Sequence, residues 1–186
     1  MVFASFILSL NYTILMITRN ATIADAQALT KLSAVTMREA FGPPLNPMEW
    51  VDAYITEGLT LSIIEQELID PHSVFFVMES ETGGLVGYAK LRQKAPPRRM
   101  RPRKALEIQR IYLLQSQIGG GLGQMLINHC LAFAKKQGYQ AVYLGVWEHN
   151  QRAIQFYERQ GFKPFGWHRF QFGPDRQRDI WMKKDL

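Results

Sequence analysis

Apolar residues in the first third of the chain recur mainly at helical intervals. After a strand-like stretch at 17–22, residues 22–41 open with Thr22 and Asp25 in the spacing of a capping box. The apolar residues that follow lie three positions apart: Ala26, Leu29, Leu32 and Val35. Residues 46–70 continue with a similar period. We expect one helix from the first segment and one or two helices from the second.

A β-hairpin is expected next. Residues 73–80 and 84–93 are rich in β-branched and aromatic residues, and residues 81–84 between them have the composition of a turn. Residues 105–114 predict a further strand. Three later segments also predict strands, and the last two form a terminal pair: 141–147, 163–172 and 178–186.

The strand at 105–114 contains a break in its alternation. Its apolar residues fall on one face before the break and on the other face after it: Leu106 and Ile108, then Ile111 and Leu113. A slip of one residue inverts the faces unless a bulge absorbs it. We therefore predict a β-bulge near Gln109 and Arg110, which leaves backbone groups free for a ligand. The alternative is a strand end buried on both faces.

Two amphipathic helices are expected in the second half of the chain. Residues 122–137 carry apolar side chains on one face, with Cys130 and His129 among them, and we interpret both residues as structural. The second helix follows Asn150 as its N-cap and ends at Gly161, a typical C′ residue. Because strands and helices alternate in this way, the sequence predicts an α/β fold.

Composition narrows the class of protein. The chain has 186 residues, of which 47% are hydrophobic and 20% charged, as expected for one domain that buries a sizeable core. One cysteine excludes an internal disulfide and is compatible with a reducing cytosol. The net charge of +6 is concentrated in the basic run 98–104, which fits a solvated loop or contact with an anionic partner better than a nucleic-acid surface.

The first 18 residues carry no charge and raise the question of a membrane segment. They lack a basic n-region, and polar residues interrupt a run already at the lower limit for spanning a bilayer. We interpret residues 1–15 as a dispensable or disordered extension and residues 16–186 as a single domain. No membrane role is expected.

The segment 115–126, QSQIGGGLGQML, places four glycines in five positions between a strand and a helix. Such a loop binds anions, because unpaired helix N-terminal amides point outward and glycine lets an oxyanion approach the backbone. A Walker loop is excluded, because Gly123 is followed by Gln124 rather than lysine. The same Gln124 occupies the third glycine position of a dinucleotide fingerprint.

The glycine loop is followed about 20 residues later by LGVWEHNQRAIQFYERQGF. The two motifs together resemble the acyl-CoA loop and the following helix of the GNAT N-acetyltransferase superfamily. The resemblance extends over residues 16–186, and the C-terminal FGPDRQRDIWMKKDL is most similar to the bacterial polyamine (spermidine/spermine) acetyltransferase branch. It implies one mixed, mostly antiparallel twisted sheet of six or seven strands, a bulged central strand and about four helices.

The resemblance also implies acetyl-CoA as co-substrate, without a metal. The pantetheine amides of acetyl-CoA would pair with the backbone of Ile111 and Leu113, and Asn150 would bind the cofactor near the reacting sulfur. The amides of the loop would hold the pyrophosphate: Gly119, Gly120, Gly121, Leu122 and Gly123. The chain departs from the family at Ile118, where glutamine or arginine is usual.

Acetyl transfer needs a neutral amine, donors for the oxyanion and an acid for the departing thiolate. By resemblance, Tyr157 is the acid, although its helix position also suits a core residue. Polyamine acetyltransferases often carry carboxylates where this chain has Gln109 and Arg110. Glu107 is therefore the nearest candidate base, and Glu148 is an alternative.

The sequence thus predicts a cytoplasmic N-acetyltransferase that acts on the primary amine of a small molecule, polyamine-like or other. A protein or peptide amine acetyltransferase and a non-catalytic acyl-CoA-binding module stay open as alternatives. No specific nucleic acid partner is expected, and a homodimer is compatible with the family.

Overall fold

Helices and strands form where the apolar periodicity predicts them. The computed structural model describes residues 16–186 except 82 and 102, so the extension at 1–15 lies outside the described residues. The helices are α1 (Ala26–Phe41), α2 (Met48–Gly58), α3 (Leu61–Ile69), α4 (Leu122–Lys136) and α5 (Gln151–Arg159), with short 3₁₀ turns at Ile23–Asp25, Arg98–Met100 and Gln115–Gln117. The strands are β1 (Ile17–Asn20), β2 (Ser73–Glu79), β3 (Leu85–Arg92), β4 (Ala105–Leu113), β5 (Ala141–Trp147), β6 (Lys163–Phe172) and β7 (Asp175–Asp185).

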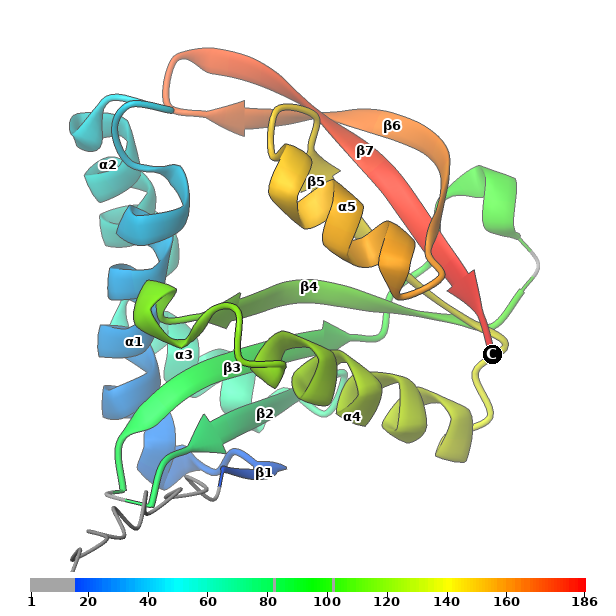
Figure 1. Ribbon diagram of the computed structural model, residues 1–186, viewed down its shortest axis with the longest axis horizontal. Helices are drawn as coiled ribbons and strands as arrows, with labels where there is room; N and C mark the ends of the chain where they lie inside the picture. The colour runs from blue at the N-terminus through cyan, green and yellow to red at the C-terminus, as the bar shows by residue number, and fades with distance from the viewer. Residues whose placement is uncertain (1–15, 82, 102) are drawn as a thin grey trace, which may run out of the picture.

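The seven strands form one sheet in the order β1-β2-β3-β4-β5-β7-β6 (Figure 1). All neighbours are antiparallel except β4 and β5, which run parallel. That pair is short, because only Ala105–Glu107 aligns with Ala141–Tyr143. After Glu107 the two central strands diverge. The mixed, mostly antiparallel sheet confirms the predicted fold, and residues 46–70 provide two helices rather than one.

The predicted bulge is confirmed in β4. Lys90 of β3 is opposite Arg110, whereas the next residue, Leu91, is opposite Ile108. Gln109 is therefore the extra residue. Because the bulge absorbs the slip, the apolar residues before and after it pack in the same core cluster: Leu106, Ile108, Ile111 and Leu113.

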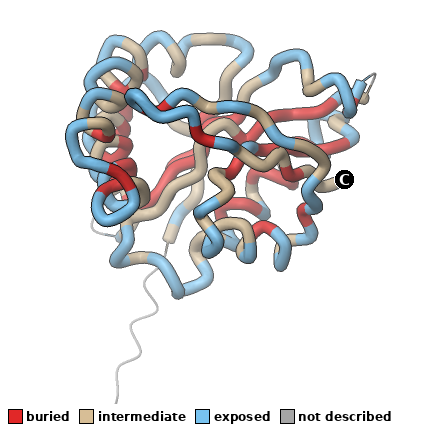
Figure 2. The backbone as a smooth tube through the Cα atoms, turned by 90° about the horizontal axis from the view of Figure 1, so that it is seen from above, coloured by how far each residue is buried: buried red, intermediate tan, exposed pale blue. Residues whose placement is uncertain are grey.

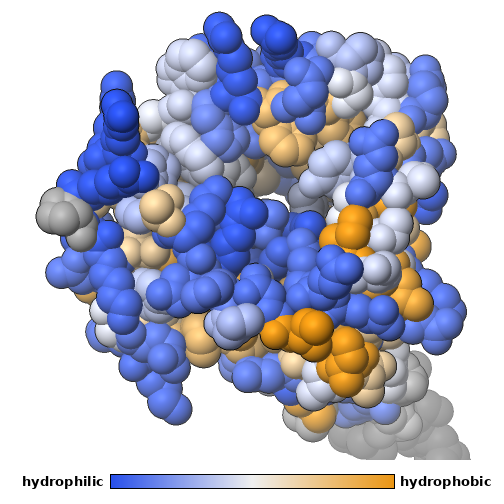
Figure 3. Space-filling model, turned by 180° about the vertical axis from the view of Figure 1, so that it is seen from behind, coloured by the Kyte–Doolittle hydropathy of each residue, from blue (hydrophilic) through white to orange (hydrophobic). Residues whose placement is uncertain are grey.

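Two apolar cores cover the two faces of the sheet. On one face, Leu126 and Cys130 of α4 and Tyr157 of α5 pack against the central strands. On the other face, Leu29 of α1 and Ile64 of α3 are completely buried. Buried positions run along the strands and the inner sides of the helices (Figure 2). Seen from behind, the surface is mainly hydrophilic, with apolar side chains gathered in smaller areas (Figure 3).

Cys130 and His129 occupy the structural positions expected of them. The Cys130 side chain is inaccessible to solvent, and burial raises the pKa of its thiol to about 12. A thiol with so high a pKa is a poor nucleophile at neutral pH. The His129 ring lies edge-on to Phe76 with ring centroids 4.5 Å apart.

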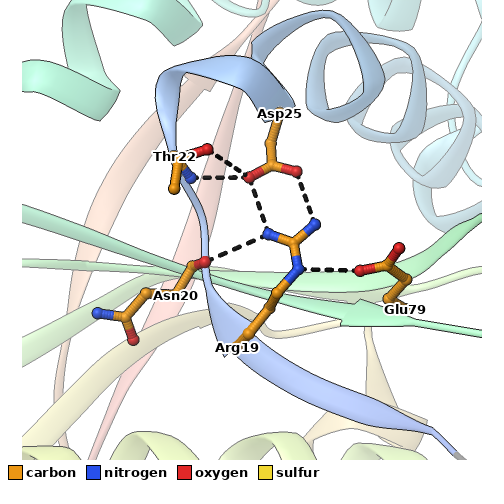
Figure 4. Close-up of polar contacts among 5 residues, drawn as sticks. All are labelled: Arg19, Asn20, Thr22, Asp25 and Glu79. Atoms are coloured by element: carbon orange, nitrogen blue, oxygen red, sulfur yellow. Dashed lines mark hydrogen bonds and ion pairs between the residues drawn. The ribbon is translucent and has the colours of Figure 1, made fainter. Parts of the chain in front are cut away.

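The start of α1 is tied to the sheet by a polar network around Arg19 (Figure 4). The guanidinium donates to Asp25 at 2.8 and 2.9 Å and to Glu79 at 2.9 Å. The backbone N–H of Thr22 donates to the same Asp25 carboxylate at 2.7 Å. This is the carboxylate half of the predicted capping box.

The basic run at 98–104 is largely tied down within the chain. Arg103 pairs with Asp185 at 2.7 Å, and the Lys104 ammonium donates to the Gln137 carbonyl at 2.9 Å. Arg99 donates to the Phe165 carbonyl at 3.1 Å. These contacts favour the interpretation of a solvated structural loop. None of the helices in the described part of the chain is long and apolar enough to cross a membrane.

Candidate active site

The divergence of β4 and β5 opens a cavity of about 980 Å³ in the middle of the sheet. One side of the cavity is lined by the bulged end of β4, the glycine loop and α5. The other side is lined by residues of α1, α2 and the β6–β7 hairpin. Segments far apart in the sequence therefore line one cavity.

The glycine loop ends at the first residue of α4 in a conformation that only glycine adopts easily. Gly119 and Gly121 have φ angles of +107° and +82°, and Gly121 is the N-cap of α4. A Cβ atom built on Gly119, Gly120 or Gly121 would have no atom within 4 Å. The loop is thus an open cradle beside the unpaired amides and positive dipole end of α4, which suits an anionic group.

Asn150 and Gly161 set the two ends of α5. The Asn150 Oδ1 atom accepts from the Ala153 N–H at 3.1 Å, as an N-cap does. Gly161 has φ +84°, and the Phe162 N–H donates to the Tyr157 carbonyl at 3.0 Å. The helix held in this way places Tyr157 on the wall of the cavity.

Tyr157 belongs to the core and to the cavity at once. Its side chain is only 8% exposed and contacts the rings of Phe156 and Phe162. Burial raises the pKa of its hydroxyl above the ordinary value of 10, so the group is protonated at neutral pH. A protonated phenol at this place can donate a proton or a hydrogen bond.

Glu107 lines the cavity at the point where β4 and β5 begin to separate. The residue is 4% exposed, and its carboxylate forms ion pairs with Arg92 and, at 3.3 Å, with Lys94. Glu148, the alternative candidate, pairs with Arg178. Each of these two carboxylates therefore has a cationic partner.

Arg110, which stands where polyamine acetyltransferases often carry a carboxylate, is itself paired with a carboxylate. It forms two hydrogen bonds with Glu67 of α3, which also pairs with the buried Lys90. Burial lowers the pKa of Lys90 to about 8, while Glu67 acts in the opposite direction. The charge of Arg110 is therefore compensated locally and is not a free repulsive charge in the cavity.

The cavity brings together most of the predicted site residues. Its lining includes the two candidate catalytic residues and six of the candidate cofactor-binding residues: Tyr157, Glu107, Ile111, Leu113, Gly119, Gly121, Gly123 and Asn150. Gly120 and Leu122 line a smaller neighbouring hollow of about 240 Å³. Ile118 is 42% exposed and lines both spaces.

Sequence reasoning missed the wall formed by β6 and β7. His168, Asp179 and Trp181 all line the cavity, although none of them was a candidate site residue. The available signal was the alternation within these strands, which places every second residue on one face. Arg152 and Arg159 of α5 are two further lining residues that the motif itself did not single out.

The sequence of the domain matches a known family. The model of the Acetyltransferase (GNAT) family matches residues 36–162. The chain belongs to this family. This GNAT protein is accordingly an acyltransferase of the N-acetyltransferase type.

Relatives of this GNAT protein support the same assignment. An uncharacterized N-acetyltransferase from the pepI 3′ region of Lactobacillus delbrueckii subsp. lactis is 31% identical over 162 residues, which cover 87% of this chain and 92% of that protein. An uncharacterized N-acetyltransferase of Mycobacterium tuberculosis is 30% identical over 164 residues, which cover 88% of this chain and 99% of that protein. The similarity therefore spans nearly the whole of both relatives.

Solved structures show the same GNAT fold. The PaiA N-acetyltransferase of Thermoplasma acidophilum, in complex with coenzyme A, has a TM-score of 0.77 at 19% identity and covers 93% of this chain and 100% of that one. The Salmonella typhimurium protein yncA, solved with its cofactor acetyl-CoA, has a TM-score of 0.65 at 20% identity, with 92% and 94% covered. At these identities the likeness concerns the fold.

Proposed function

We propose that this protein transfers the acetyl group of acetyl-CoA to a primary amine of a small molecule, by direct attack of the amine in a ternary complex. The observation that carries the proposal is that the open glycine cradle at the start of α4 and the buried Tyr157 face one cavity, between two diverging central strands. An anion site and a proton donor are the two groups that a CoA thioester reaction requires of the protein.

The residues of the cradle fit the cofactor. Gly119, Gly120 and Gly121 leave room for a pyrophosphate against the backbone, since nothing lies within 4 Å of their added Cβ atoms. The backbone of Ile111 and Leu113 in the divergent part of β4 is proposed to pair with the amides of the pantetheine arm. Remaining members of the proposed cofactor site are Leu122, Gly123 and Asn150, and Arg152 is a candidate cation for the phosphates.

Two side chains are proposed to move protons. Tyr157 is the proposed acid for the departing thiolate, because burial keeps its hydroxyl protonated. Glu107 is the proposed base, acting through a water on the amine. Its ion pairs with Arg92 and Lys94 occupy part of its hydrogen-bonding capacity.

The first test is binding of acetyl-CoA by calorimetry, followed by a thiol-release assay with polyamines, amino acids, aminoglycosides and peptides as acceptors. We expect binding and thiol release with at least one small primary amine. Polyamines belong in the panel because the resemblance favours that branch. Binding without release for the whole panel would instead identify a non-catalytic acyl-CoA module, and release only with peptides would identify a peptide amine acetyltransferase.

The second test is Tyr157→Phe. We expect it to keep acetyl-CoA affinity and to lower kcat by about one to two orders of magnitude or more, the range of a general acid. Tyr139→Phe is the matched control, because Tyr139 lies outside the cavity lining and packs under the Lys104 ammonium. Equal kcat in the wild type and Tyr157→Phe would remove the assignment of the acid.

A further inference from the structure

Alternation along the β6–β7 hairpin places one set of side chains on the cavity. Every second residue of each strand points to the same face, and this set lines the cavity: His168, Phe170 and Phe172 of β6, and Gln177, Asp179 and Trp181 of β7. In the register of the hairpin, His168 is directly opposite Asp179. The wall therefore consists of aromatic rings around one carboxylate.

Gly145 marks where this wall approaches the central strands. It is exposed although its neighbours in β5, Leu144 and Val146, are buried. A Cβ atom on Gly145 would lie 3.5 Å from the Asp179 Oδ2 atom and 3.4 Å from Trp181. Gly145 lies on β5, the strand that diverges from β4. Its exposed backbone and the Asp179 carboxylate therefore border the same space.

Asp179 has no partner for its charge. Within residues 16–186, leaving aside 82 and 102, no side chain forms a hydrogen bond or ion pair with its carboxylate. Burial raises its pKa to about 6, which leaves the group mostly ionised at neutral pH. His168 does not supply a positive charge, because burial first and Lys94 second lower its pKa. A partly buried carboxylate without a cation is costly unless a ligand provides one.

The remaining charges of the cavity disfavour a second cation on the ligand. Cationic side chains in the lining outnumber carboxylates, and Arg92 and Lys94 already share Glu107. Aromatic rings, by contrast, are abundant in the lining of the same cavity. The aromatic rings that the wall and the facing elements contribute are those of Phe41, Tyr54, Trp147, Phe170, Phe172 and Trp181. Such rings bind flat apolar groups and stabilise one ammonium through cation–π contacts.

We infer that Asp179 binds the ammonium group of the acceptor, and that the acceptor is a monoamine with an aromatic or other bulky apolar body rather than a polyamine. This inference rests on the proposed function. Asp179 is assigned as a binding residue. Glu107 remains the proposed base that removes the proton before the attack.

The experiment compares three acceptors, 2-phenylethylamine, n-propylamine and spermidine, in the thiol-release assay at pH 8. For the wild type we expect kcat/KM to be at least about 10-fold higher for 2-phenylethylamine than for the other two. Asp179→Asn, which keeps the shape and removes the charge, is expected to raise the KM for 2-phenylethylamine about 10-fold or more and to change kcat and acetyl-CoA affinity less than 3-fold. Asp175→Asn is the matched control, because Asp175 is exposed at the start of the same strand.

Thermal unfolding separates this role from a structural one. Because Asp179 lacks a partner, Asp179→Asn should unfold at the same temperature as the wild type or a higher one, whereas loss of a structural ion pair would lower the temperature. Gly145→Ala provides a second variant, since its methyl group would enter the space beside Asp179 and raise the KM for the bulky amine.

The outcomes distinguish the two proposals. Thiol release that prefers spermidine, or an unchanged KM in Asp179→Asn, overturns the inference and leaves the proposed function intact. Absence of acetyl-CoA binding and of thiol release in the wild type overturns both. An Asp179→Asn protein that no longer folds identifies a structural residue and overturns the inference as well.

Discussion

Asp25 and Asp179 illustrate how the surroundings of one residue type determine its charge. Asp25 accepts hydrogen bonds from Arg19 and from Thr22, and these contacts, the Arg19 bonds most of all, lower its pKa to about 2. Asp179 is partly buried without such partners, and its pKa is raised to about 6. The first carboxylate stabilises the fold, whereas the second is held at a cost and faces the cavity.

Asp25→Asn is expected to destabilise the protein in a pH-dependent way. The pKa of Asp25 is lower in the folded state than its ordinary value of 3.8, so its stabilisation is fully present above about pH 4 and is lost as the pH falls toward 2. We expect a loss of about 1–2 kcal/mol at pH 7, after allowing for solvent screening at Arg19, whose side chain is 36% exposed. Urea unfolding of both proteins at pH 7 and pH 3 measures the difference.

The control for this prediction is the exposed ion pair between Arg38 and Asp52, whose side chains are 45% and 48% exposed. Asp52→Asn should change the free energy of unfolding by less than about 0.5 kcal/mol. A loss in Asp25→Asn that is equal at pH 7 and pH 3 would contradict the role of its charge.

Residues with a motif were predictable and residues without one were not. Tyr157 and Asn150 follow from the spacing in the second motif, and the structure places both on the cavity. The partner of Arg110 could not be predicted, because Glu67 lies 43 positions earlier in the sequence and only the packing of α3 brings it close. Asp179 was missed for a similar reason, since its role depends on what surrounds it in space.

At the scale of elements, the glycine loop shows how backbone conformation prepares a site. Gly121 is both the N-cap of α4 and a residue with φ +82°. A side chain there would strain the turn that presents the helix amides. Gly120, its neighbour, has no positive φ.

Gly121→Ala and Gly120→Ala therefore form a matched pair. Both added methyl groups would meet no atom within 4 Å, so only backbone strain distinguishes them. We expect Gly121→Ala to lose about 1–2 kcal/mol of stability and to bind acetyl-CoA more weakly, because the loop must change to relieve the strain. Gly120→Ala should keep its stability within about 0.5 kcal/mol. Urea unfolding and calorimetry test both statements, and equal stabilities would refute the strain argument.

Local pattern predicted the elements better than their arrangement. The one-residue slip in 105–114 predicted the bulge, because a bulge keeps the apolar residues on one face, and the register of β3 and β4 decides for it against a strand end buried on both faces. The strand order could not be obtained in this way. The last strand, β7, lies between β5 and β6, and this depends on contacts along the whole length of β5 that periodicity does not encode.

At the scale of the molecule, one buried contact beside the cavity joins two segments that lie 131 residues apart in the sequence. The Gln177 side chain of β7 donates to Asn46 Oδ1 at 2.8 Å, and Asn46 donates to the Phe41 carbonyl at 2.8 Å. Both side chains are buried. This contact joins the segment between α1 and α2 to the β6–β7 hairpin.

Asn46→Ala is expected to destabilise the protein by about 1–3 kcal/mol, because it leaves the buried Gln177 amide and the Phe41 carbonyl without their partner. Differential scanning calorimetry measures the loss. Gln171→Ala serves as control, since Gln171 is exposed and bonds only the Gly173 carbonyl nearby. A loss no larger than that of the control would show that this buried contact contributes no more to stability than an exposed hydrogen bond.

The divergence of β4 and β5 also bears on solubility. Past Glu107 and Tyr143, each of these central strands has one side that no other described strand pairs. Free strand edges are usually a risk, because they template pairing with other chains and lead to aggregation. Here the two edges face each other across the cavity inside the domain, and β7 and β6 continue the sheet beyond β5, so that neither edge lies at the outer margin of the sheet.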